Sequence, residues 1–520
     1  MSWAAVVTVA AALALGVFAM NPLPIGAFHD DARYLLLAKS IAEGTGYRFV
    51  FVPGAPAGTH FPPAFPLVLA ALWRLAPAFP ASETLFKLLN AAMLALAAFA
   101  TFAFARNRAG LAPWAAAAVA LAFAGSVPVL FLDGVLFSEP FFIAALLGAL
   151  MLSERTLRGE AHEDGQWPLA GLAFAAGLAI GGVTMVRTLG IALGVGLALT
   201  LVFRRQWQGV AVSMAGIALL VVPWQLWTMR HGGEIPPILA GDYGTYGAWV
   251  GAALHTEGAG FVARVAQANL RGFSILLDVF GVTGGIAVIV AVPLALALGV
   301  GLRRLHRTAP VSVASLAVYL AVVLIWPGTP DRFLWPMWPL LLTGVACGAA
   351  EVVKWSTVAT GARIGRAAML ASLLVCGALF LKFNVGMYAS RDWEDPARAN
   401  AKLAIAAAET ATQLPPGLIA SEFDAAVSLY TGHPAVPLLP LMAANYLRPR
   451  TPQEAAAQLS EIIDAYHPAF LLVGSGEALQ AATILAKAAS PRIRFNSVSP
   501  SGIVLYVPTG NPHSESRIVK

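Results

Sequence analysis

The sequence predicts a polytopic α-helical membrane protein with about eleven transmembrane helices, external amphipathic helices in its first loop and a small C-terminal α/β domain. Of its 520 residues, 58% are hydrophobic and only 12% are charged, whereas an average soluble domain has roughly a quarter charged residues. Apolar runs of about 17 to 22 residues recur as far as Asn384, each long enough to cross a hydrocarbon core. Because lipid cannot hydrogen-bond the backbone and the runs are too continuous for barrel strands, the spans are expected to be helices.

The apolar runs predict eleven spans in chain order. The first run has no basic segment before it, so we interpret it as a span and not as a signal peptide. The predicted spans lie near residues 3–21, 84–105, 112–131, 138–153, 168–186, 188–203, 209–228, 282–302, 310–326, 333–350 and 366–384.

Basic residues gather in short clusters that fall in alternate loops between the apolar runs. By the positive-inside rule these loops are cytoplasmic, which places the N-terminus in the cytoplasm and the first loop and the tail outside. We therefore expect a multi-pass protein of the bacterial inner membrane with a periplasmic or extracellular tail. Topology accounts for the net charge of +6, so no nucleic-acid partner is expected. The clusters are Arg106 with Arg108, Arg155 with Arg158, Arg204 with Arg205, Arg303 with Arg304 and Arg307, and Lys354 with Arg363 and Arg366.

The tail changes character at about residue 388. Helical stretches alternate there with short β-rich runs, a pattern typical of a small α/β domain outside the membrane. The sequence therefore predicts a membrane domain of residues 1–387 and a soluble C-terminal domain of residues 388–520. The expected helices cover residues 397–410, 452–466 and 476–489, and the expected strands cover 417–420, 469–473 and 503–507.

Two adjacent carboxylates, Asp30 and Asp31, open the first external loop and are followed by Arg33. Carboxylates so close to a span are costly unless they are hydrated, paired or used in chemistry. Adjacent residues do not face the same way, so one of the pair can point into a cavity while the other caps the helix that begins near Ala32. The alternative is that both cap this helix and sit in water.

His60 lies in a proline-rich segment, residues 59–66, that follows an amphipathic helix expected over 32–43. The prolines forbid a regular helix, yet the segment is too apolar for a free loop, so it is expected along the membrane interface. His60 would either donate to a phosphate at headgroup depth or bond to a local carbonyl.

Three further charges stand at the ends of apolar runs. Glu139 opens the fourth span at its external end, where the helix dipole alone would stabilise a carboxylate. Arg332 lies at the external end of the tenth span. Its guanidinium is suited to bind a phosphate, and the alternatives are that it pairs with Asp331 or snorkels to the surface. Arg187 lies between the fifth and sixth spans, and Glu139 is a candidate partner for it.

Four of these segments together resemble the motifs of a known enzyme class. Residues 30–34 resemble the acidic signature in the first external loop of GT-C glycosyltransferases, the group that contains protein O-mannosyltransferases and lipid A aminoarabinose transferases. Residues 60–63 resemble the Pro-Pro segment that follows it. Residues 138–140 resemble the second acidic motif, and residues 331–336 resemble the late arginine motif. The resemblance covers roughly residues 1–350 in order and spacing.

The resemblance implies an enzyme that moves a sugar from a polyprenyl-phosphate-linked donor to a hydroxyl of a lipid, glycan or protein acceptor. It implies that Asp30 is the catalytic base and that Asp31 and Glu139 assist acceptor or metal binding. It further implies that Arg332 holds the lipid phosphate. Arg33, His60 and Arg187 are further candidates for substrate contact. A divalent metal is left open, and no other cofactor is implied.

This sequence departs from the family at two positions. Phe61 stands where the aminoarabinose transferases carry a lysine, so His60 is the nearest substitute for that phosphate contact. The second acidic residue of the pair is Asp31 and not glutamate.

The leaving group determines the expected mechanism. A glycosidase needs two carboxylates because an alkoxide must be protonated as it leaves. A polyprenyl phosphate leaves as a stable anion, so one base and nearby cationic groups are enough, and a single displacement inverts the anomeric centre.

The alternative from another functional class is a transporter or lipid flippase, and a third candidate is a phosphoethanolamine or acyl transferase. Transporters usually place ionisable groups near the bilayer midplane, often in repeated halves. Here the charges lie at the external ends of spans and no repeat is visible, which favours the glycosyltransferase.

Overall fold

The computed structural model describes residues 2–158, 169–354 and 360–509. Parts of the predicted membrane domain and residues 510–520 of the predicted C-terminal domain therefore lie outside the described residues. The chain forms two compact units, each assembled from separate stretches of sequence. The first comprises Met1–Asn21, Lys87–Trp224 and Val265–Trp393, and the second comprises Pro22–Phe86, Gln225–Arg264 and Glu394–Lys520.

The domain boundary predicted at residue 388 stays a prediction. In the structure the tail from Glu394 shares its compact unit with two segments that the topology assigned to external loops.

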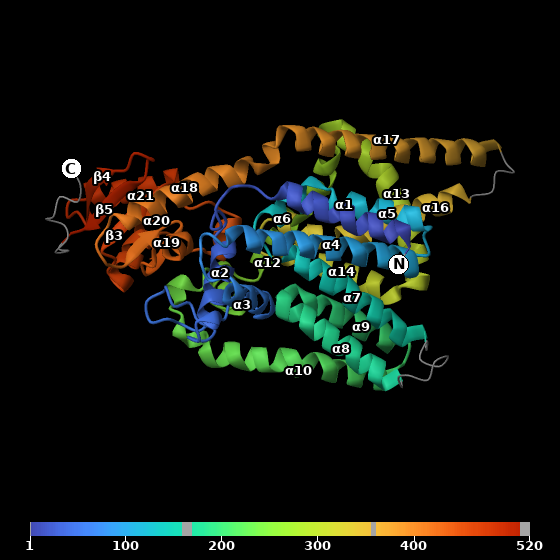
Figure 1. The fold of residues 1–520 in the computed structure, drawn as a ribbon, viewed down its shortest axis with the longest axis horizontal. Helices are drawn as coiled ribbons and strands as arrows, with labels where there is room; N and C mark the ends of the chain where they lie inside the picture. The colour runs from blue at the N-terminus through green and yellow to red at the C-terminus, as the bar shows by residue number, and fades with distance from the viewer. Residues whose placement is uncertain (1, 159–168, 355–359, 510–520) are drawn as a thin grey trace. The chain divides into compact units, whose positions relative to one another are not determined.

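The helices of the first unit are mostly long and apolar (Figure 1). They are joined by short 3-10 turns, of which η2 (Thr188–Gly190), η5 (Phe273–Phe280) and η6 (Trp335–Met337) interrupt apolar stretches. The helices that form this unit or begin or end in it are α1 (Trp3–Ala19), α4 (Glu83–Asn107), α5 (Pro113–Ala124), α6 (Val127–Gly134), α7 (Glu139–Arg158), α8 (Leu169–Val186), α9 (Ile191–Phe203), α10 (Trp207–His231), α12 (Gly260–Gly272), α13 (Gly284–Thr308), α14 (Pro310–Ile325), α15 (Asp331–Leu334), α16 (Trp338–Val353) and α17 (Thr360–Ser390).

Small residues allow the apolar helices to approach one another closely. Gly301 of α13 packs against the backbone of Gly344 in α16, and Gly348 packs against the carbonyl of Ala297, so a side chain at either position would clash. Inside a membrane the hydrophobic effect does not drive helices together. Close packing of small residues is therefore a usual way in which membrane helices associate.

Six helices within the described ranges are long and apolar enough to cross a membrane, and a seventh span results if the bent pair α5 and α6 counts as one. Helices α1, α8, α9 and α14 are apolar but shorter. Every predicted span coincides with a helix or a helix pair, and the chain is a polytopic helical membrane protein. The total of eleven spans stays a prediction.

The second unit combines helices with a five-stranded sheet in the order β2-β1-β3-β5-β4. Strands β2, β1 and β3 are parallel, and β5 runs antiparallel to both of its neighbours. The strands are β1 (Ile419–Ser421), β2 (Ala435–Pro437), β3 (Phe470–Val473), β4 (Ile493–Val498) and β5 (Val504–Pro508). The helices and 3-10 turns are α2 (Asp30–Ala42), α3 (Ala64–Leu75), η3 (Gly232–Glu234), η4 (Pro237–Leu239), α11 (Tyr246–Glu257), η7 (Asp392–Glu394, at the unit boundary), α18 (Asp395–Thr412), α19 (Asp424–Thr431), η8 (Ala443–Tyr446), α20 (Pro452–Tyr466) and α21 (Gly476–Lys487).

The small C-terminal sheet expected from the sequence is confirmed, although two of its strands and α19 were not predicted. Strand β2 begins directly after Pro434 and ends at Pro437, and prolines argue against a strand. Strand β4 mixes polar and apolar residues on both faces. Helix α19 packs against α2 of the first loop. This packing brings the start of α19 to the start of the first loop helix, where Asp424 lies 3.8 Å from Arg33.

Candidate functional site

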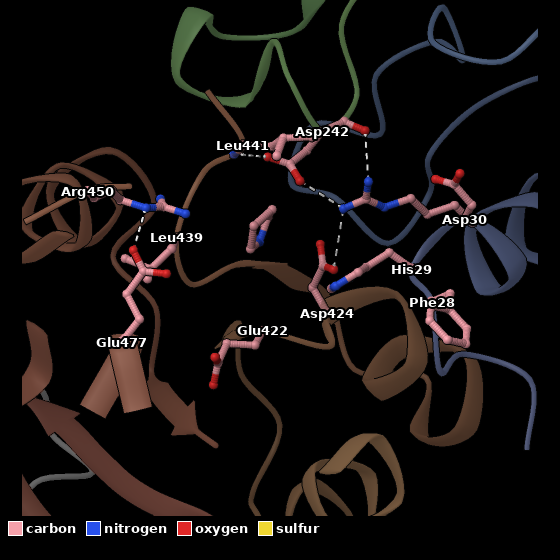
Figure 2. A pocket seen from close by; sticks show the side chains of 12 residues that line it. Phe28, His29, Asp30, Asp242, Glu422, Asp424, Leu439, Leu441, Arg450 and Glu477 are labelled. Atoms are coloured by element: carbon pink, nitrogen blue, oxygen red, sulfur yellow. Dashed lines mark hydrogen bonds and ion pairs between the residues drawn. The ribbon is translucent and has the colours of Figure 1, made fainter. Parts of the chain in front are cut away.

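A pocket of about 330 Å³ lies in the second unit, at the start of α2 (Figure 2). Three parts of the chain build its wall: the start of the first loop helix, the loop before α11, and the tail. Its lining residues are Phe28, His29, Asp30, Arg33, Asp242, Glu422, Asp424, Pro437, Leu439, Leu441, Arg450 and Glu477.

The two adjacent aspartates at the start of α2 have different surroundings. Asp30 lines the pocket, whereas the buried carboxylate of Asp31 accepts backbone N–H groups from Gly26 at 2.8 Å, Ala32 at 2.9 Å and Phe28 at 3.3 Å. Burial raises the pKa of the Asp31 carboxyl, and these N–H groups oppose the rise. Asp31 thus fixes the loop that presents Asp30 to the pocket.

The backbone before Asp30 is strained. His29 has a φ of 49°, in a region that residues other than glycine rarely adopt. Its ring stacks on Phe423, with centroids 5.6 Å apart. Such strain persists where the surrounding structure enforces it, and it gathers at functional sites.

Arg33, one turn after Asp30, is held on several sides. Its guanidinium donates to the carbonyl oxygen of Asp242 at 3.2 Å and to the Asp242 Oδ1 at 3.0 Å. It also lies 4.6 Å from the ring centroid of Tyr243 and 3.8 Å from Asp424 Oδ1. The Asp242 Oδ2 accepts the backbone N–H of Leu441 at 2.9 Å, so this aspartate joins the first loop to the tail. Figure 2 shows these bonds converging on the pocket.

Asp424, the first residue of α19, is fully buried in the pocket wall. Its Oδ2 accepts a short hydrogen bond from the Tyr243 hydroxyl. Burial raises the pKa of the Asp424 carboxyl, and the neighbouring Arg33 opposes the rise.

On the side of the pocket away from Asp30 in Figure 2, the tail contributes three more charged side chains, those of Glu422, Arg450 and Glu477. The Glu422 carboxylate accepts the N–H groups of Gly474 at 2.6 Å and Ser475 at 2.8 Å, just before α21. Arg450 pairs with Glu477 at 2.7 Å. Backbone N–H groups at a helix N-terminus favour a negative charge beside them, so they hold the Glu422 carboxylate in place.

His60 also belongs to the second unit but does not line the pocket. Its Nδ1 lies 2.7 Å from the carbonyl oxygen of Gly244, and its ring packs against Phe61 and Tyr246. Burial lowers the pKa of the His60 imidazole, which favours the neutral ring with Nδ1–H as the donor. This contact matches the local-carbonyl alternative. A phosphate contact by His60 stays a hypothesis.

The remaining predicted residues meet in the first unit. The fully buried Glu139, first residue of α7, accepts with its Oε1 from Arg187 at 2.6 Å and from the Nε of Arg332. The pairing of Arg187 with Glu139 considered from the sequence is therefore observed. Arg187 also donates to Ser138 at 3.1 Å, and the guanidinium of Arg332 lies 3.8 Å from the ring centroid of Phe137.

Helix ends place these three charges together. Glu139 opens α7, Arg187 has an extended backbone between α8 and η2, and Arg332 lies in the single turn of α15. The two arginine side chains are 12% and 22% exposed, while the glutamate is not exposed at all. Two guanidinium groups converge on this one carboxylate, and their planar sets of N–H groups suit the oxygens of a phosphate.

Among the residues that the structure describes, no three His, Cys, Asp or Glu side chains gather into a metal-binding group. The Asp31 carboxylate is surrounded by backbone N–H donors and that of Glu139 by two arginines. Such surroundings favour the anion itself and offer no further ligands to a cation. Metal binding by Asp31 or Glu139 stays a hypothesis.

No sequence-family description matches the chain, and no curated protein matches it by sequence. Solved structures do resemble it. ArnT from Cupriavidus metallidurans bound to undecaprenyl phosphate is 15% identical with a TM-score of 0.56, over 97% of this chain and 98% of that chain. The Archaeoglobus fulgidus oligosaccharyltransferase tethered to an acceptor peptide is 10% identical, with a TM-score of 0.51, over 97% and 74%. The structure of AglB from the same organism with an inhibitory peptide and a dolichol-phosphate is 12% identical, with a TM-score of 0.50, over 98% and 74%.

Proposed function

We propose that this chain, which has the fold of the GT-C glycosyltransferases, transfers a sugar from a polyprenyl-phosphate-linked donor to an acceptor hydroxyl. The acceptor is a lipid, a glycan or a protein, and the reaction takes place at the periplasmic face of a bacterial inner membrane. The observation that carries the proposal is the half-buried Asp30, which the anchored Asp31 presents to a polar pocket outside the apolar helices. The similar structures that contain undecaprenyl phosphate and dolichol-phosphate support a lipid phosphate as the carrier.

Asp30 is the proposed base. Its carboxylate takes the proton of the acceptor hydroxyl as that oxygen attacks the anomeric carbon of the donor. The bond between the anomeric carbon and the phosphate oxygen breaks at the same time, and the lipid phosphate leaves as an anion. One base is sufficient because this leaving group needs no proton. The anomeric centre is inverted in this single displacement.

Arg187 and Arg332 are the proposed phosphate ligands. A guanidinium presents a planar fork of N–H groups that matches two phosphate oxygens. Both arginines are oriented by one buried carboxylate, that of Glu139, and both reach partly exposed surface. Their positive charge would stabilise the negative charge that develops on the leaving phosphate.

The test is mass spectrometry of the purified full-length enzyme incubated with polyprenyl-phosphate sugars and a panel of candidate acceptors. The wild type is expected to yield a glycosylated acceptor and free polyprenyl phosphate, and Asp30→Asn is expected to yield neither. Glu43→Gln is the matched control because Glu43 is an exposed carboxylate at the other end of the same helix. Product formation by Asp30→Asn at the wild-type rate would remove Asp30 from the role. Movement of intact lipid across vesicles without sugar transfer would favour the flippase alternative.

A further inference from the structure

The pocket beside Asp30 is rich in hydrogen-bond acceptors and poor in available donors. Five carboxylates line it, together with two arginines and His29, whose ring stacks on Phe423. Both arginines are occupied by protein partners: Arg33 by Asp242 and Arg450 by Glu477. A ligand in this pocket therefore meets mostly oxygen acceptors and a surplus of negative charge.

One carboxylate oxygen in the wall makes no hydrogen bond. The Oδ1 of Asp424 is buried and has no hydrogen-bond partner among the described residues, and its nearest cation, Arg33, lies 3.8 Å away. Buried polar groups in folded proteins almost always have a hydrogen-bond partner, so an orphan in a pocket wall indicates a missing ligand or water. The other oxygen of Asp424 is held by Tyr243, which fixes the direction of the carboxylate.

The tail supplies a second carboxylate whose position is fixed by backbone hydrogen bonds. Glu422 is half-buried, lines the pocket and is bound by two backbone N–H groups at the start of α21. A negative charge on a ligand would be repelled by Glu422, by Asp424 and by the base Asp30 together. Such repulsion is strong in a partly enclosed site because the effective dielectric constant is far below that of water.

We infer that this pocket receives an uncharged, hydroxyl-rich part of the acceptor and excludes acceptors with a phosphate or carboxylate next to the reacting hydroxyl. Asp424 is the specificity-determining residue, and Glu422 adds to the same selection. The inference rests on the proposed function because it takes Asp30 as the base that meets the acceptor. It also gives the C-terminal tail a role in recognising the substrate.

The test compares two probes that differ only at one carbon of the sugar. Hexyl glucoside carries a hydroxymethyl group where hexyl glucuronide carries a carboxylate. Their dissociation constants are measured by ligand-observed NMR titration against the purified full-length protein in lipid nanodiscs. The wild type is expected to bind the glucoside about tenfold or more tightly than the glucuronide, the scale of one repulsive charge in a partly buried site.

Two variants assign this selectivity to the tail. Asp424→Asn removes a charge and keeps an oxygen that can accept from Tyr243, and Glu422→Gln likewise keeps an acceptor for the N–H groups of Gly474 and Ser475. Each is expected to reduce the ratio of the two dissociation constants to about threefold or less. Glu461→Gln, an exposed glutamate of α20 outside the pocket, is the matched control and keeps the wild-type ratio.

Equal binding of both probes by the wild type, or binding of neither, would overturn the inference. An unchanged ratio in Glu422→Gln would overturn the role of the tail even if Asp424→Asn did not fold. Sugar transfer that depends on Asp30 would persist in each of these cases, so the proposed function is tested separately.

Discussion

Removal of the Glu139 charge is expected to destabilise the protein strongly. In Glu139→Gln, the two arginines that share the fully buried carboxylate lose this acidic partner, which lies 2.6 Å from Arg187. Loss of one partner of a buried ion pair costs about 3–5 kcal/mol because an uncompensated charge remains. The arginine side chains are partly exposed and glutamine still accepts one hydrogen bond, so we expect a loss of about 3 kcal/mol.

A half-buried counterpart in the same unit provides the control. Glu351 also bridges two cations, Arg304 at 2.9 Å and Lys354 at 3.2 Å, but its side chain is 33% exposed and that of Lys354 is 65% exposed. Ion pairs that water can reach contribute about 0–1 kcal/mol, so Glu351→Gln should change stability less than Glu139→Gln does. The assay is equilibrium unfolding of each variant in the same mixed micelles. A Glu139→Gln variant as stable as Glu351→Gln would refute the assignment of a buried, energetically coupled cluster.

The same variant tests whether the arginines bind phosphate. A ligand that binds the folded state raises apparent stability in proportion to the logarithm of its concentration over its dissociation constant. Without the competing carboxylate, Arg187 and Arg332 should hold a lipid phosphate more tightly. Added undecaprenyl phosphate should therefore raise the unfolding midpoint of Glu139→Gln more than that of the wild type. An equal or smaller rise would contradict phosphate binding at this cluster.

Three further changes test the second unit. Asp31→Ala removes the acceptor of three backbone N–H groups and should lower the free energy of unfolding by about 2–3 kcal/mol, measured by the same equilibrium unfolding. Tyr243→Phe leaves buried Asp424 without its hydrogen-bond donor and should lower the free energy of unfolding by about 1–3 kcal/mol. If the losses of the Tyr243→Phe and Asp424→Asn variants simply add in the double variant, the two side chains are not coupled. Burial lowers the pKa of His60 below its ordinary 6.5, so the unfolded chain binds the proton more readily and stability should fall as the pH drops below about 6.5. In His60→Asn the free energy of unfolding should lack this part of the pH dependence. If the stability of the variant and of the wild type changes with pH in the same way, the ring is not held neutral.

The helical fold could be predicted because each span carries its own signal. Long apolar runs and basic clusters identify helices and loops without knowledge of their partners, so every predicted span coincides with a helix or a helix pair. The sheet was predicted in part. Strands β1, β3 and β5 are short apolar runs that stand out in the sequence. Strands β2 and β4 are strands because they pair with β1 and β5, and this pairing exists only in the folded chain.

The candidate site divides in the same way. Asp30, Glu139 and Arg332 are candidates that the sequence itself provides, because charges beside an apolar run are conspicuous, and their roles stay predictions. Asp242 and Asp424 could not be predicted, since nothing in the local sequence distinguishes either residue and each reaches the pocket only by tertiary folding. Arg33 meets Asp242 across 209 positions of the sequence, and Tyr243 meets Asp424 across 181.

The most direct test of sugar transfer is a side-by-side measurement of donor binding and single-turnover transfer in Asp30→Asn. If Asp30 acts as the base, the variant should bind a polyprenyl-phosphate sugar with a dissociation constant within about twofold of the wild type. Its transfer rate should fall by about 10²–10⁴, the usual contribution of a general base. A transfer rate equal to that of the wild type, or loss of donor binding together with transfer, would contradict this account.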